Sequence, residues 1–122
     1  MTEATSTKGL LICSDLFFTS KVTGTAQALG MQMESVDDVA SALSRINGGE
    51  FSYVILDLAS RNASVAELIA AMPSSGSIPV IAFGSHVNAD QLESARNAGA
   101  EVMPRSQFSA TLPELLRRIN RS

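Results

Sequence analysis

Two aspartates are the residues of this 122-residue chain whose type and position best fit a reactive site. Asp15 follows the apolar run GLLIC closely, and Asp57 directly follows the run YVIL. A carboxylate that comes after a buried run loses solvation, so it needs a cation or hydrogen-bond donors beside it. A hard divalent ion such as Mg²⁺, held by one or two carboxylates and otherwise by water, suits such a pair. If the two runs are neighbours in the fold, the sequence predicts an anionic, Mg²⁺-binding crevice.

The remaining side chains with reactive chemistry favour structural roles. Cys13, the single cysteine, lies inside an apolar run, where a reduced thiol packs as a small hydrophobic group. His86 lies in a predicted loop, where most lone histidines are solvated, although a role near the aspartates is the alternative. The sequence has no Ser-His-Asp or Cys-His order, no cluster of His and Cys, and no GxGxxG or Walker loop. We therefore do not expect an ordinary enzyme.

The segment Thr23-Gly24-Thr25 is similar to the phosphate-binding TGxT loop of flavodoxins. In flavodoxins that loop directly follows the first strand, so its N–H groups at a helix start can bind phosphate. Here the segment lies about ten residues later, inside a predicted helix whose N–H groups are already used. A bound flavin is therefore not expected.

Five short apolar runs alternate with segments of helical spacing. The runs cover residues 9–13, 31–36, 53–58, 78–83 and 101–103. The third and fourth runs are continuous rather than alternating, which is typical of strands covered on both faces. The helical spacing between them is clear in Phe18, Val22, Thr25 and Leu29, and again in Val36, Val39, Leu43 and Ile46.

Start and stop signals mark the ends of these predicted helices. Possible helix starts are Ser64 with Glu67, Asn88 with Gln91, and Thr111 with Glu114, the last with Pro113 in the first turn. The stop signals are Asn47-Gly48-Gly49, Pro73 and Gly99.

The order of elements predicts an α/β fold: a single doubly wound (βα)5 sandwich around a five-stranded parallel sheet, of the flavodoxin-like or receiver-like type. The common strand order is 2-1-3-4-5, which makes the first and third strands neighbours where ligands bind, and so brings Asp15 and Asp57 to one crevice. We expect one domain over residues 8–122, preceded by a loose, polar terminus over residues 1–7.

Composition agrees with a folded, cytoplasmic domain. Hydrophobic residues make up 45% and charged residues 17%, and no apolar run approaches the length of a membrane span. The net charge of −3 gives no reason to expect nucleic-acid binding. The basic cluster Arg117, Arg118 and Arg121 fits the last turn of a helix, with an interaction tail as the alternative.

Motifs along nearly the whole chain are similar to those of the receiver domain of two-component response regulators. They are LLICSD, ALG before the second strand, YVILDL, IPVIAFGS, ARNAGA, and a fifth strand that leads to Arg105. The resemblance implies that Asp57 accepts a phosphoryl group from a histidine kinase or phosphotransfer protein. It also implies that Asp15, Asp57 and the Ala59 backbone carbonyl hold Mg²⁺, and that any catalysis is limited to self-phosphorylation and autodephosphorylation at Asp57.

Several positions depart from the receiver pattern. The acidic pair is reduced to Ser14-Asp15, and the hydroxyl residue after the fourth strand is replaced by Gly84, with Ser85 displaced by one. The lysine of the fifth strand is missing; Arg105 is its possible substitute, in a segment about two residues shorter than the pattern. These departures predict an atypical receiver with degraded switch chemistry. The alternative is a pseudo-receiver that binds partner proteins independently of phosphorylation.

In receivers the fourth helix, fifth strand and fifth helix carry dimerisation and output, so a homodimer through this face is expected here. Met103 and Phe108 lie beside the fifth strand, and such residues are common in contact patches. The alternative is that both side chains close the core beneath the last helix.

Overall fold

The computed structural model describes residues 8–46, 51–60, 64–70, 78–85 and 87–121, and within these ranges the predicted five-stranded parallel sheet is present. The strand order is β2-β1-β3-β4-β5, as the sequence predicted. The strands are β1 (Lys8–Ile12), β2 (Gln32–Val36), β3 (Tyr53–Asp57), β4 (Val80–Gly84) and β5 (Glu101–Pro104). Val36 is the last residue of β2, as the predicted run 31–36 indicated. Its helical spacing with Val39 had suggested that it also begins the second helix, and this was wrong.

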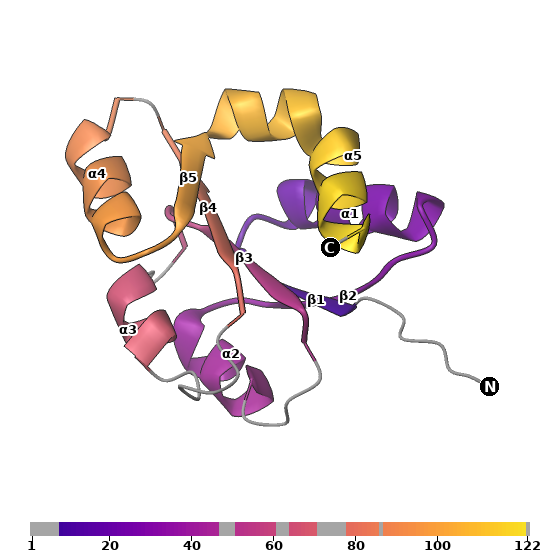
Figure 1. Ribbon diagram of the computed structural model, residues 1–122, viewed down its shortest axis with the longest axis horizontal. Coiled ribbons are helices and arrows are strands. Elements are labelled where there is room, and N and C mark those ends of the chain that lie inside the picture. The colour runs from indigo at the N-terminus through magenta and orange to yellow at the C-terminus, as the bar shows by residue number, and fades with distance from the viewer. Residues whose placement is uncertain (1–7, 47–50, 61–63, 71–77, 86, 122) are drawn as a thin grey trace.

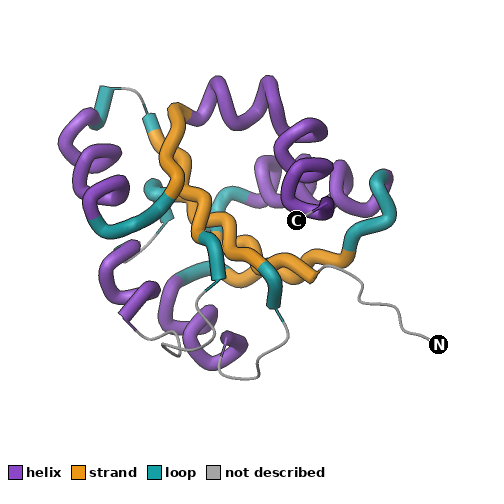
Figure 2. Tube along the Cα trace, in the orientation of Figure 1, coloured by secondary structure: helices purple, strands orange, loops and turns teal. Residues whose placement is uncertain are grey.

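Helices cover both faces of the sheet. They are α1 (Leu16–Ala28), α2 (Val39–Ile46), α3 (Val65–Ala70), α4 (Ala89–Asn97) and α5 (Arg105–Arg121). Figure 1 shows α1 and α5 on one side and α2, α3 and α4 on the other. In Figure 2 the strands form a twisted layer between the two groups of helices.

The central strands form the core on both of their faces, which explains their continuous apolar sequences. Every residue of β3 and β4 is buried. Val54 and Leu56 pack into one cluster with α2, α3 and α4, whereas Tyr53 and Ile55 pack into the other with α1 and α5. This alternation follows from the two-residue period of a strand.

Some of the predicted helix signals are confirmed. Ser64 Oγ accepts a hydrogen bond of 3.2 Å from Glu67 N at the start of α3, and Gly99 has a φ of +114° just after α4. Asn88 precedes α4 but makes no side-chain cap, and the Gln91 side chain donates instead to the Leu58 carbonyl at 2.8 Å. The predicted stops Asn47-Gly48-Gly49 and Pro73, and the predicted loose terminus 1–7, lie outside the described residues.

The last helix begins earlier than the sequence indicated. It starts at Arg105 rather than at Thr111, and Thr111 Oγ1 donates back to the Gln107 carbonyl at 2.8 Å instead of capping a helix. Pro113 thus lies inside the helix and not in its first turn. Because proline has no N–H to donate, a bend is expected, and α5 changes direction partway along in Figure 1.

Met103 and Phe108 are core residues and not surface contacts. Their exposed fractions are 6% and 0%, and both pack in the cluster beneath α1 and α5. The core interpretation is therefore the correct one for these side chains. Arg118, in the basic cluster at the end of α5, forms an ion pair of 2.8 Å with Glu101 of β5.

Thr23-Gly24-Thr25 lies within α1, as expected. The Thr23 and Thr25 hydroxyls donate to the carbonyls of Thr19 and Lys21, so this segment offers no phosphate-binding loop. In the part of the chain that the structure describes, no helix combines the length and apolar character needed to cross a membrane.

Candidate functional site

Asp57 is the last residue of β3, at the carboxyl edge of the sheet and next to the neighbouring strands β1 and β4. Ligands bind at this edge in doubly wound folds, beside the point where the strand order reverses. The Asp57 side chain is nevertheless only 2% exposed, because it faces inward among the elements that follow the strands. A buried carboxylate needs donors, so its partners define the site.

Three donors hold the Asp57 carboxylate. Ala59 N donates to Oδ1 at 2.9 Å, and Arg105 Nη2 donates to the same oxygen at 3.0 Å. The Cys13 thiol lies 3.3 Å from Oδ2 and 3.6 Å from the Asp15 carbonyl oxygen, and the shorter contact directs its one proton to Oδ2. Each carboxylate oxygen therefore has a protein donor, and one of the donors is a cation.

Arg105 reaches Asp57 from the first residue of α5, which confirms the expectation that its side chain points there. Its guanidinium carbon lies 5.1 Å from the ring centroid of Phe18 and 5.2 Å from that of Phe83, both within cation–π range. These rings and the ion pair fix the guanidinium against the carboxylate, while a third of the side chain stays exposed.

Cys13 is a site residue that the sequence did not reveal. It is 2% exposed and follows the end of β1 directly, so its thiol faces Asp57 across the gap between β1 and β3. Burial raises the pKa of this thiol above its ordinary value of 9.0, and the nearby Asp57 carboxylate acts in the same direction. The thiol is therefore protonated at neutral pH and able to donate.

Asp15 is the N-cap of α1. Its Oδ1 accepts hydrogen bonds from Phe17 N at 2.9 Å and Phe18 N at 3.2 Å. The residue is exposed and is not among the partners of Asp57. Asp15 therefore stabilises the first turn of α1.

The end of β4 carries no hydroxyl group near Asp57. A Cβ atom on Gly84 would lie 3.3 Å from two atoms of the Leu58 side chain, so a larger residue there would need Leu58 to move.

Ser85 Oγ accepts a hydrogen bond of 3.3 Å from Val87 N. Ser85 also lines a cavity of about 400 Å³ with Phe18, Arg105, Ser106 and Ser109. His86 lies outside the described residues.

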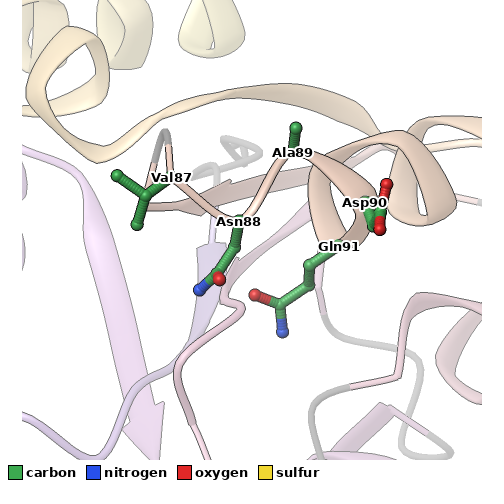
Figure 3. Close-up of a pocket in the computed structure, with 5 residues that line it drawn as sticks. All are labelled: Val87, Asn88, Ala89, Asp90 and Gln91. Atoms are coloured by element: carbon green, nitrogen blue, oxygen red, sulfur yellow. The ribbon is translucent and has the colours of Figure 1, made fainter.

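A second hollow lies at the start of α4, where Figure 3 shows its lining. It measures about 550 Å³ and is lined by residues 87–91. In Figure 3 the Asn88 and Gln91 amides point to the same side, whereas Val87 and Asp90 point elsewhere. The hollow has a single carboxylate and does not include Asp57, so it adds nothing to the chemistry of the site.

The donors around Asp57 fit Mg²⁺ poorly. The described residues contain no group of three or more His, Cys, Asp or Glu side chains placed to hold a metal. Mg²⁺ requires oxygen ligands, yet one neighbour of Asp57 is a soft, neutral thiol and another is a guanidinium that repels cations. The second predicted carboxylate, Asp15, uses its Oδ1 to cap α1.

No protein-family model matches the chain, and no curated protein sequence does either. Solved structures do match. The receiver domain of the sensor histidine kinase PA1611 from Pseudomonas aeruginosa PAO1, described with a magnesium ion in its active-site cleft, has a TM-score of 0.79 at 17% identity, over 96% of this chain and 99% of that one. The chemotaxis response regulator CheY4 of Vibrio cholerae gives 0.78 at 19% identity, over 93% and 98%.

The receiver domain of NtrX from Brucella abortus gives a TM-score of 0.76 at 22% identity, over 93% of this chain and 98% of that one. Similarity at such identities establishes the fold. This chain therefore has the receiver-domain fold of two-component response regulators, as the sequence resemblance implied.

Proposed function

We propose that this chain is a receiver-like signalling domain that acts by binding partner proteins and does not depend on phosphorylation of Asp57. The observation that carries the proposal is the state of the Asp57 carboxylate, which is 2% exposed with donors on both oxygens. A phosphoacceptor has to present one oxygen in line with the donor phosphorus, and here both oxygens already accept hydrogen bonds, from Cys13 and Arg105.

The surface around this edge supports a partner-binding role. Among the described residues, the large hydrophobic side chains with high exposure are Leu16 at 78%, Phe17 at 91% and Val87 at 74%. Leu16 and Phe17 open α1, which follows β1, and Val87 follows β4, so all three come after the carboxyl ends of parallel strands. Large apolar side chains exposed at this edge are available for contact with a partner protein. A homodimer through α4, β5 and α5 stays a prediction, now without Met103 and Phe108 as contacts.

Phosphoryl acceptance at Asp57 is the second candidate, and Arg105 is the observation that favours it. A guanidinium 3.0 Å from Oδ1 could neutralise charge on a transferred phosphoryl group from a histidine kinase or phosphotransfer protein. Ser85 would be the nearest substitute for the missing hydroxyl, from its place in the cavity beside Arg105. The Mg²⁺ that assists this chemistry in receivers has a poor set of ligands here, because Asp57 is its single well-placed carboxylate.

Intact-mass measurement after incubation with acetyl phosphate and Mg²⁺ tests the proposal. We expect no phosphorylated species in the wild-type protein. The Asp57→Asn variant is the matched control, because it retains the shape of the site without the acceptor. A phosphorylated species in the wild-type protein that is absent from Asp57→Asn would refute the proposal in favour of the second candidate.

A further inference from the structure

The residue that faces Asp57 from β1 is a cysteine, and this placement determines what the site can bind. Cys13 Sγ lies 3.3 Å from Asp57 Oδ2, whereas Asp15, two residues later, accepts hydrogen bonds from the first turn of α1. The register of the two strands fixes this arrangement, because Ile12 pairs with Leu56. The residue that follows Ile12 is Cys13, and the residue that follows Leu56 is Asp57, so these two residues lie opposite each other. Cys13 therefore lies directly after β1 and faces Asp57, where a carboxylate in its place could share an ion with Asp57.

The charge at Asp57 is already balanced by protein groups. Arg105 supplies one positive charge to Oδ1, and Ala59 N supplies a further donor to the same oxygen. The thiol completes the set by donating to Oδ2. A divalent cation that displaced the thiol proton would gain only a soft sulfur ligand. A cation that displaced the guanidinium would break the hydrogen-bonded ion pair between Arg105 and Asp57.

We propose that Cys13 is a positioning residue that, together with Arg105, takes the place of a metal ion at Asp57, so that the carboxylate is held by protein donors alone. This inference concerns the same site as the proposed function, but it holds whether or not Asp57 accepts a phosphoryl group. Its tests measure a thiol vibration and metal affinity, so its failure can be told apart from failure of the proposed function.

The S–H stretching band in the Raman spectrum reads the thiol directly, and the chain has a single cysteine, so the band has one source. We expect the band at lower wavenumber in the wild-type protein than in Asp57→Asn, because an S–H group that donates to a carboxylate is weakened more than one beside a neutral amide. A band at the same wavenumber in both proteins would overturn the inference.

Metal titration tests the consequence. By calorimetry with Mg²⁺, and by water-proton relaxation with Mn²⁺, we expect no saturable binding to the wild-type protein at millimolar metal. Cys13→Asp places a second carboxylate beside Asp57 and should raise the affinity by about tenfold or more. Ser20→Asp is the matched control: it adds the same charge at an exposed position of α1, outside the pair Ser14-Asp15, and should leave binding unchanged.

Saturable Mg²⁺ binding by the wild-type protein would overturn the inference, and so would a folded Cys13→Asp variant with no gain over Ser20→Asp. Circular dichroism checks the fold of each variant. If Cys13→Asp does not fold, the wild-type titration and the S–H band decide the question without it.

Discussion

Replacing Arg105 with alanine removes the cation that contacts Asp57. The Asp57 side chain is 2% exposed in the wild-type protein, and its cation partner Arg105 is one third exposed. Two donors stay in place, Ala59 N on Oδ1 and the Cys13 thiol on Oδ2. The carboxylate would then keep hydrogen bonds but lose its charge partner.

The expected cost follows from this geometry. Breaking a fully buried ion pair by removing one partner costs about 3–5 kcal/mol, but Arg105 is one third exposed, so solvent screens part of that loss. The contacts of the guanidinium with Phe18 and Phe83 add about 0.5–1 kcal/mol. We expect Arg105→Ala to lower the free energy of unfolding by about 2 kcal/mol.

Urea unfolding of a double-mutant cycle with Asp57→Asn measures the pair itself. Arg105→Ala should cost about 1 kcal/mol less in the Asp57→Asn background than in the wild type, because no buried charge is then left without a counter-charge. Arg105→Lys keeps the charge but not the planar fork, and should fall between wild type and Arg105→Ala. An Arg105→Ala variant within about 0.5 kcal/mol of wild type, with no coupling to Asp57→Asn, would refute this reasoning.

Three further variants test the packing that supports the site. Tyr53→Phe should raise the free energy of unfolding by about 1 kcal/mol, because the Tyr53 hydroxyl is buried and has no partner among the described residues. Burial raises the pKa of Tyr53 from 10.0 to about 12. The Tyr53 phenol therefore ionises at a lower pH in the unfolded chain than in the folded one, and the stability of the wild-type protein falls as the pH rises from 10 to about 12. Urea unfolding at a series of pH values should show that Tyr53→Phe lacks this fall. Gly24→Ala, in open space within α1, should raise stability by about 1 kcal/mol, whereas Gly99→Ala should lower it by a similar amount, because Gly99 has a φ of +114°. The opposite order in thermal unfolding would contradict the assigned backbone conformations.

The sheet could be predicted from the sequence because its central strands are buried on both faces. Residues 53–58 and 78–83 had to read as continuous apolar runs, and the helical spacing between runs then left one common topology. Asp57 was predictable for the same reason, since a charged residue at the end of such a run lies at the ligand-binding edge.

The partners of Asp57 were harder to predict, because they depend on single-residue register. Cys13 lies in an apolar run and so looks like a core residue, and the neighbouring sequence does not distinguish a packed thiol from one that donates to a carboxylate. Asp15 lies two residues further along the chain, where its Oδ1 caps the first turn of α1. Both residues follow the end of β1, where the alternation of a strand gives way to the first turn of α1, and the sequence leaves the position of that change uncertain by one or two residues.

The start of α5 was mispredicted because Thr111, Pro113 and Glu114 together look like a helix N-terminus. The apolar spacing of Phe108, Leu112 and Leu115 already had the helical period, and burial of these side chains against β4 and β5 outweighs the cost of an internal proline. Because the helix starts at Arg105, the guanidinium lies beside Asp57.

The most direct test of the central claim is a pair of amide ¹H–¹⁵N NMR spectra of the wild-type domain, recorded before and after addition of acetyl phosphate and Mg²⁺. If Asp57 is held by Cys13, Arg105 and Ala59 and signalling needs no phosphorylation, the two spectra should superimpose across α4, β5 and α5. New resonances that spread from Asp57 to these elements, and that are absent from Asp57→Asn, would contradict the account.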